Sequence, residues 1–289
     1  MKRVDAAASL FLAVGLVSLA GCGDIPFQGD PFAITPRDAE LNIDKHPVDY
    51  AALMRIGAAA HGAGDHSTAV SVYRRAASVE TRLPEPFVAL GNTLLEMGNA
   101  NEAILAYNAA LRRAEHDPDG LRGLARAYLM GGKPELAGQP LALAFHDTPD
   151  DPKLLQLIGV ADDFVGQHEE AQARYRRGLE LLPGDPALSL NLAMSLALVG
   201  NYPEAIGVLR PIANATNSSA RERQTLALIY GLAGDRGAAE RLSRRDLDPE
   251  AVARNLAYYD SLRRMSPEAR TQALQALGAH ASPTAGQPS

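Results

Sequence analysis

The chain has 289 residues, of which 46% are apolar and only 5% aromatic, and it contains no tryptophan. Its formal net charge of −6, without any run of basic residues, argues against nucleic-acid binding, which requires phosphates to be neutralised. A single cysteine excludes an internal disulfide, so packing alone must stabilise the fold.

The first 21 residues have the features of a bacterial signal peptide. Met1–Arg3 carry positive charge, and residues 6–20 form an almost unbroken apolar run that is too short to span a bilayer comfortably. The run ends in Leu19-Ala20-Gly21-Cys22, which resembles the lipobox of bacterial lipoproteins. The resemblance implies cleavage before Cys22 and acylation of this cysteine, for example with palmitate. The alternative is an ordinary signal peptide that ends in a cysteine by chance.

The residues after Cys22 predict where the protein goes and how it is tethered. In lipoproteins a residue other than Asp after the cysteine implies export, so Gly23 predicts a lipid anchor on the periplasmic face of the outer membrane. Asp24 stands one position later, so retention at the inner membrane remains the alternative. Residues 22–49 are rich in proline and lack a helical period, which predicts a flexible tether. Residues 282–289 are predicted to be a disordered tail.

Residues 50–281 contain a repeat of 34 residues. Asp-Pro pairs recur at this interval, at Asp117, Asp151 and Asp185, and such a pair begins a helix because Asp caps the free amides and Pro fits the first turn. Glycines at the same interval suit the left-handed residue that ends a helix. They are Gly64, Gly98, Gly132, Gly166, Gly200 and Gly234. The interval predicts six helix-turn-helix units. They start at Tyr50, Pro84, Pro118, Pro152, Pro186 and Ala220.

Two further series of small residues complete the register. The eighth positions of the units are Gly57, Gly91, Ala125, Gly159, Ala193 and Ala227, and the twentieth are Ala69, Ala103, Ala137, Ala171, Ala205 and Ala239. This register resembles the tetratricopeptide repeat, in which small residues let two antiparallel helices approach and a large residue at position 24 fills the gap between pairs. The resemblance implies an all-α, right-handed superhelical solenoid of six repeats.

The sixth repeat departs from this pattern. Ser243 and Asp246 stand where the family has large and small apolar residues, as is common in terminal repeats. Pro249–Met265 is predicted to form a C-terminal capping helix, and Pro267–Leu277 a further helix.

No catalytic, metal or cofactor site is predicted, and the protein is not expected to be an enzyme. The seven histidines include no pair at i,i+4 with a glutamate between, the pattern of a zinc site on one helix. The glycine-rich stretches follow helices, so they are helix ends and not phosphate loops.

The family's geometry places positions 2, 5, 9 and 12 of each first helix along a concave groove. Arg122 and Arg126 lie four residues apart on one helix face, and Asn92 stands one repeat earlier at the position that matches Arg126. This arrangement resembles part of the carboxylate clamp by which some such domains hold a peptide C-terminus. The alternative, favoured by the sequence, is that both arginines pair with nearby carboxylates such as Asp119 or Asp163.

The same groove-lining positions form rows that continue into the later repeats. Gln156 is expected to line the groove in the fourth repeat, and Leu190 and Met194 make the fifth repeat apolar. An apolar row beside a basic spot suits a docked helix or peptide, so these residues complete the predicted partner-binding set.

The combination of lipobox, tether, six repeats and the run Asn255-Leu256-Ala257 after the last repeat resembles the TadD family. These are lipoproteins of the tight-adherence (Flp) pilus machinery. The resemblance implies a pilotin-like protein that supports assembly of an outer-membrane secretin. Alternatives are a lipoprotein scaffold for type IV pili, for outer-membrane protein assembly or for cell-wall hydrolases. A peptidoglycan-processing enzyme is a further alternative, for which the sequence offers no catalytic residues.

Overall fold

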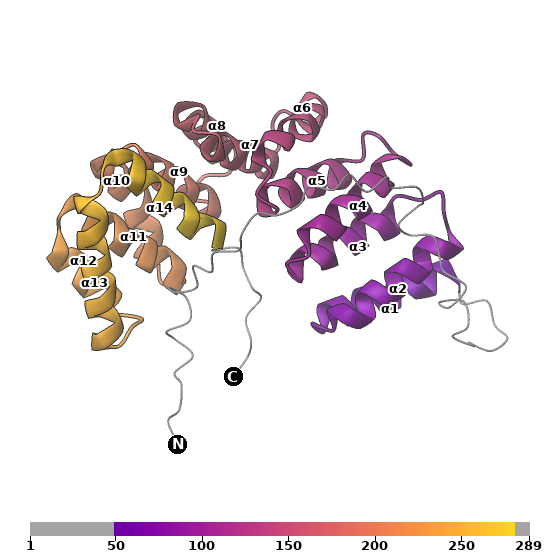
Figure 1. Cartoon of the computed structure of the whole chain (residues 1–289), viewed down its shortest axis with the longest axis horizontal. Coiled ribbons are helices and arrows are strands. Elements are labelled where there is room, and N and C mark those ends of the chain that lie inside the picture. Colours follow the sequence, from indigo (N-terminus) through magenta and orange to yellow (C-terminus); the bar gives the residue numbers. More distant parts are fainter. Residues whose placement is uncertain (1–48, 281–289) are drawn as a thin grey trace, which may run out of the picture. The chain divides into compact units, whose positions relative to one another are not determined.

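The computed structural model describes residues 49–280, and this part of the chain is entirely helical (Figure 1). Each repeat consists of a first and a second helix. The first helices are α1 (Tyr50–Gly62), α3 (Glu85–Glu96), α5 (Pro118–Met130), α7 (Pro152–Phe164), α9 (Pro186–Leu198) and α11 (Ala220–Ala233). The second helices are α2 (His66–Val79), α4 (Ala100–Leu111), α6 (Gly138–Asp147, preceded by the 3-10 turn η1, Pro134–Leu136), α8 (His168–Leu181), α10 (Tyr202–Ala213) and α12 (Arg236–Ser243).

Successive helices pack against one another in chain order, which confirms the prediction of an all-α helical repeat solenoid. The predicted signal peptide, Cys22, most of the tether and the tail lie outside the described residues. Within residues 49–280, no helix is both long and apolar enough to cross a membrane.

The helix starts follow from the Asp-Pro pairs, as predicted. The carboxylate of Asp117 accepts a hydrogen bond from the amide of Gly120 at 2.6 Å, and that of Asp185 from the amide of Leu188 at 2.8 Å. Asp151 caps α7 in the same way, through the amide of Lys153 at 2.9 Å. Each cap satisfies one amide that the first helical turn leaves without a partner.

The turns between paired helices depend on glycine. All six glycines of the 34-residue series have positive φ values between 69° and 88°, which confirms the prediction that they end the first helices. Gly184 also has a positive φ, of 78°, at the junction between α8 and α9, which the series does not include. An L-residue with a side chain is strained in this conformation.

Within each of the first five repeats, the residues at positions 8 and 24 are matched in size. A Cβ added to Gly57 would lie 2.5 Å from Cε1 of Tyr73, and one added to Gly159 would lie 2.5 Å from Cε1 of Tyr175. Glycine therefore makes room for the tyrosine ring. Where position 8 is alanine, position 24 is leucine. The pairs are Gly57 with Tyr73, Gly91 with Tyr107 and Gly159 with Tyr175, and then Ala125 with Leu141 and Ala193 with Leu209.

The C-terminal helices α13 (Pro249–Arg264) and α14 (Pro267–His280) are present where the sequence predicts them. Tyr259 of α13 packs over Gly231 of α11, where a Cβ would lie 2.5 Å from its ring. In the irregular sixth repeat Ser243 is fully buried, and Asp246 accepts hydrogen bonds from Arg223 and Gln224. Arg223 lowers the pKa of Asp246, so this pair stabilises the fold at neutral pH and is lost only in acid.

Substitution of Ala171 by leucine tests the packing in the middle of the array. Ala171 of α8 is fully buried among Tyr175 and the apolar side chains of the fifth repeat. We expect Ala171→Leu to lower the free energy of unfolding by about 1–3 kcal/mol, because the larger side chain must displace packed neighbours. Chemical denaturation followed by circular dichroism measures this change. Ala173→Leu, at an exposed position of the same helix, is the control and should leave stability nearly unchanged.

Candidate functional site

The first helices form a continuous face along the array. Helix α3 contacts α5, α5 contacts α7, α7 contacts α9, and α9 contacts α11 (Figure 1). The predicted partner-binding residues lie on α3, α5, α7 and α9. Side chains at matching positions of successive repeats therefore lie on neighbouring first helices.

Arg122 is paired within the chain. Its Nη1 donates to Oδ2 of Asp151 at 2.6 Å, and its Nη2 donates to Oδ1 of Asp119 at 2.5 Å. Asp119 is one of the carboxylates that the sequence offered for such a pairing, whereas Asp163 bonds to other groups. The charge of Arg122 is therefore largely compensated, and its guanidinium is held at the junction of α5 and α7.

Arg126, one turn further along α5, is exposed. Within residues 49–280 its guanidinium makes no hydrogen bond or ion pair, so its positive charge faces solvent. It lies near the hydroxyl of Tyr107, on whose pKa its charge acts. That hydroxyl donates to Oδ1 of Asn92 at 2.7 Å, and burial raises the pKa of Tyr107, so the hydroxyl stays protonated. The Tyr107 hydroxyl thus fixes the amide oxygen of Asn92 and also lies near the charge of Arg126.

The fourth repeat adds a buried polar network around Asp163, about two turns along α7 from the half-buried Gln156. The carboxylate of Asp163 accepts hydrogen bonds from Tyr175 at 2.9 Å and from Ser195 at 2.7 Å, and it lies 2.8 Å from Nδ1 of His168. Burial raises the pKa of Asp163, and the hydrogen bonds oppose this shift. The network joins α7, α8 and α9, so it fixes the fourth repeat to the fifth.

The apolar row of the fifth repeat is covered by the chain itself. Leu190 is only 8% exposed, and Met194 packs against the core cluster that contains Leu228 and Leu274. Helix α14 contacts α9, and the hydroxyl of Thr271 donates to the carbonyl of Leu198 at 3.4 Å. The sequence predicted an open apolar surface at Leu190 and Met194. In this structure Leu190 is buried and Met194 is half-buried, so little of that surface is open, and partner binding there stays a prediction.

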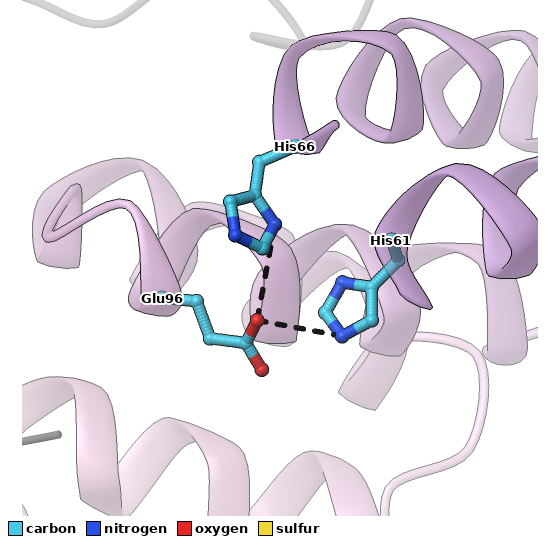
Figure 2. Close-up of side chains that lie close together, drawn as sticks. All are labelled: His61, His66 and Glu96. Atoms are coloured by element: carbon cyan, nitrogen blue, oxygen red, sulfur yellow. Dashed lines mark ion pairs between the residues drawn. The ribbon is translucent and has the colours of Figure 1, made fainter. Parts of the chain in front are cut away.

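One cluster was missed by the sequence analysis. His61 at the end of α1, His66 at the start of α2 and Glu96 at the end of α3 point toward one another (Figure 2). Nε2 of His61 lies 3.4 Å from Oε2 of Glu96, and Nδ1 of His66 lies 3.8 Å from the same oxygen. The test for i,i+4 pairs on one helix could not find them, since they come from three helices. The only sequence signal was two histidines on either side of one tight turn.

Family models of the tetratricopeptide repeat match residues 88–152 and 165–229. Among curated proteins, anaphase-promoting complex subunit 7 of Arabidopsis thaliana is 30% identical over 146 residues, which cover 50% of this chain and 26% of that protein. The chain thus spans about a quarter of the length of this relative.

Solved structures show the same fold. A tetratricopeptide repeat protein from Parabacteroides merdae superimposes with a TM-score of 0.62 and 16% identity, covering 74% of this chain and 85% of that one. Pseudomonas aeruginosa pilF superimposes with a TM-score of 0.56 and 19% identity, covering 78% and 96%. Residues 88–152 and 165–229 thus match tetratricopeptide-repeat models, and they lie within a longer helical repeat solenoid.

Proposed function

We propose that this protein is a lipid-anchored adaptor that binds another protein through the face formed by α3, α5 and α7. The observation that carries the proposal is the exposed guanidinium of Arg126, which has no partner among residues 49–280 and lies near the Tyr107 hydroxyl that fixes the amide of Asn92. Tetratricopeptide repeats typically act as scaffolds for protein–protein interaction, which supports a binding role and not a catalytic one.

The ligand chemistry follows from the groups on this face. An exposed arginine next to an oriented amide suits a carboxylate, either an acidic side chain or a free C-terminus. Arg122 contributes less than Arg126, because its guanidinium already pairs with Asp119 and Asp151. Gln156 lies on α7, the next first helix after α5, and extends the polar face. Leu190 is buried and Met194 is half-buried, so they add little to this face.

The partner that we propose is an outer-membrane secretin of a tight-adherence pilus, with this chain as a pilotin-like factor held by acylated Cys22. The support is the resemblance of residues 19–22 to a lipobox and of the run at 255–257 to the TadD family. The alternative is a scaffold for another envelope machine, such as one that assembles type IV pili or outer-membrane proteins or regulates cell-wall hydrolases. A secretin gene adjacent to this one would favour the first reading.

A synthetic peptide of the C-terminal residues of that secretin tests the proposal. We expect fluorescence anisotropy to show saturable binding, and the double change Arg122→Ala, Arg126→Ala to weaken it at least roughly tenfold, since hydrogen bonds to charged groups contribute about 1.5–3 kcal/mol. Arg126→Ala alone should account for most of the loss. Amidation of the peptide's C-terminus should weaken binding if the free carboxylate is the ligand.

Arg74→Ala is the matched control, because Arg74 is an exposed arginine on a second helix that pairs with Glu102. Its loss should leave binding unchanged. Equal binding by the double variant and by the wild type would contradict this site.

A further inference from the structure

The side chains of His61, His66 and Glu96 converge on one point from three helices (Figure 2). One ligand atom from each lies within 4.8 Å of the other two. The centroids of the two imidazole rings are 5.5 Å apart in an edge-to-face arrangement. Two imidazole nitrogens and one carboxylate oxygen are a common ligand set of protein-bound zinc.

The distances in the cluster suit metal ligands better than ion pairs. Charge-assisted hydrogen bonds between nitrogen and oxygen are about 2.7–2.9 Å long. The observed separations from Oε2 of Glu96 are 3.4 Å to His61 and 3.8 Å to His66. Ligand atoms about 2.0–2.1 Å from a tetrahedral zinc ion lie roughly 3.3–3.4 Å apart, so small side-chain movements would complete the geometry.

The hydrogen bonds of Thr93 fix which nitrogen of His61 can bind a metal. The Thr93 hydroxyl donates its only proton to the carbonyl of Ala89 at 2.9 Å, so it accepts from Nδ1 of His61, 3.2 Å away. Nε2 of the neutral ring then directs a lone pair at the carboxylate of Glu96. Two electron-rich atoms facing each other repel, and a cation between them removes the repulsion. A metal-bound histidine is usually oriented through its other ring nitrogen in this way.

His66 leads to the same conclusion. Its Nδ1 is buried from solvent and has no hydrogen-bond partner within residues 49–280, although it is directed at Glu96. A buried polar atom without a partner is costly, and coordination to a metal would satisfy it. The ends of α1 and α3 also direct their carbonyl dipoles toward this region, which favours a cation, while the start of α2 opposes it.

We propose that His61, His66 and Glu96 form a binding site for a divalent transition-metal ion of zinc-like chemistry. Nitrogen ligands disfavour magnesium and calcium, which prefer oxygen. Three protein ligands leave a fourth position for water or for a ligand from a partner. Because the ligands come from both helices of the first repeat and from α3, the ion links the first repeat to the second.

Calorimetric titration of the full chain with zinc chloride tests the site, after chelator treatment and without a histidine tag. We expect one ion to bind in this cluster, and His66→Asn and Glu96→Gln each to weaken binding at least tenfold. Replacement of zinc by Co²⁺ should give the intense visible absorption of four-coordinate cobalt. Zinc should also slow amide hydrogen exchange in α1 and α2 of the wild type but not in the two variants.

A second group of two histidines and a carboxylate provides the matched control. His116 and His146 each bond through Nδ1 to a different oxygen of Asp147, both at 2.9 Å, so they do not converge on one point. His146→Asn should therefore bind zinc as the wild type does. The site is disproved if the wild type does not bind zinc, or if His66→Asn and Glu96→Gln bind it unchanged. Unchanged binding by both variants would also be the result if zinc were bound at Cys22, because every variant retains this cysteine.

Discussion

Replacement of Tyr107 by alanine is expected to lower the free energy of unfolding by about 3–5 kcal/mol, the typical cost of truncating a buried aromatic residue. The Tyr107 ring is fully buried and lies over two glycines from neighbouring first helices. A Cβ on Gly91 would lie 2.8 Å from the ring, and one on Gly123 only 2.1 Å from Cε1. The ring thus fills the space where α3, α4 and α5 meet, and its loss leaves a cavity between the second and third repeats.

Urea denaturation followed by circular dichroism measures the effect. Tyr107→Phe is the control, because it keeps the ring and removes only the hydrogen bond to Asn92, a loss of about 1 kcal/mol. Since each repeat contacts only its neighbours, the alanine variant should also separate the array into parts that unfold at different urea concentrations. If the two variants are equally stable, ring packing does not hold these repeats together.

Replacement of Cys22 by serine is expected to abolish anchoring through acyl chains. Several acyl chains on one residue hold a protein stably at a membrane, whereas a single chain gives only marginal binding. Serine has nearly the same size but no thiol to acylate. In cells fed labelled palmitate, the wild type should be labelled and enter the detergent phase, and the serine variant should remain unlabelled and either uncleaved or soluble.

Thermal unfolding of the two purified proteins is the control for this experiment. The repeat array begins at Tyr50, well after Cys22, so both proteins should unfold at the same temperature. A serine variant that is labelled and fractionates like the wild type would contradict the lipoprotein prediction and leave an ordinary signal peptide as the explanation.

The sequence alone was sufficient for features that depend on neighbouring residues. The carboxylates of Asp117 and Asp185 each accept a hydrogen bond from an amide three residues further along the chain, at the start of a helix. The glycine series ends each first helix at a positive φ. These interactions span only a few bonds of the chain, so residue type and spacing determine them. The 34-residue period then sets the number of helix pairs, because each repeat forms the same helix-turn-helix unit.

The candidate sites depended on contacts between repeats, which the period does not encode. Arg122 and Arg126 look alike in the sequence, yet Asp151 from the next repeat neutralises only the first. Leu190 is apolar in either case, and its packing in the core cluster of the fourth to sixth repeats buries it. His61 and Glu96 are far apart along the chain, and the packing of α2 against both α1 and α3 brings them within 3.4 Å. Side-chain charge and burial depend on neighbours in space, and only the tertiary structure determines those.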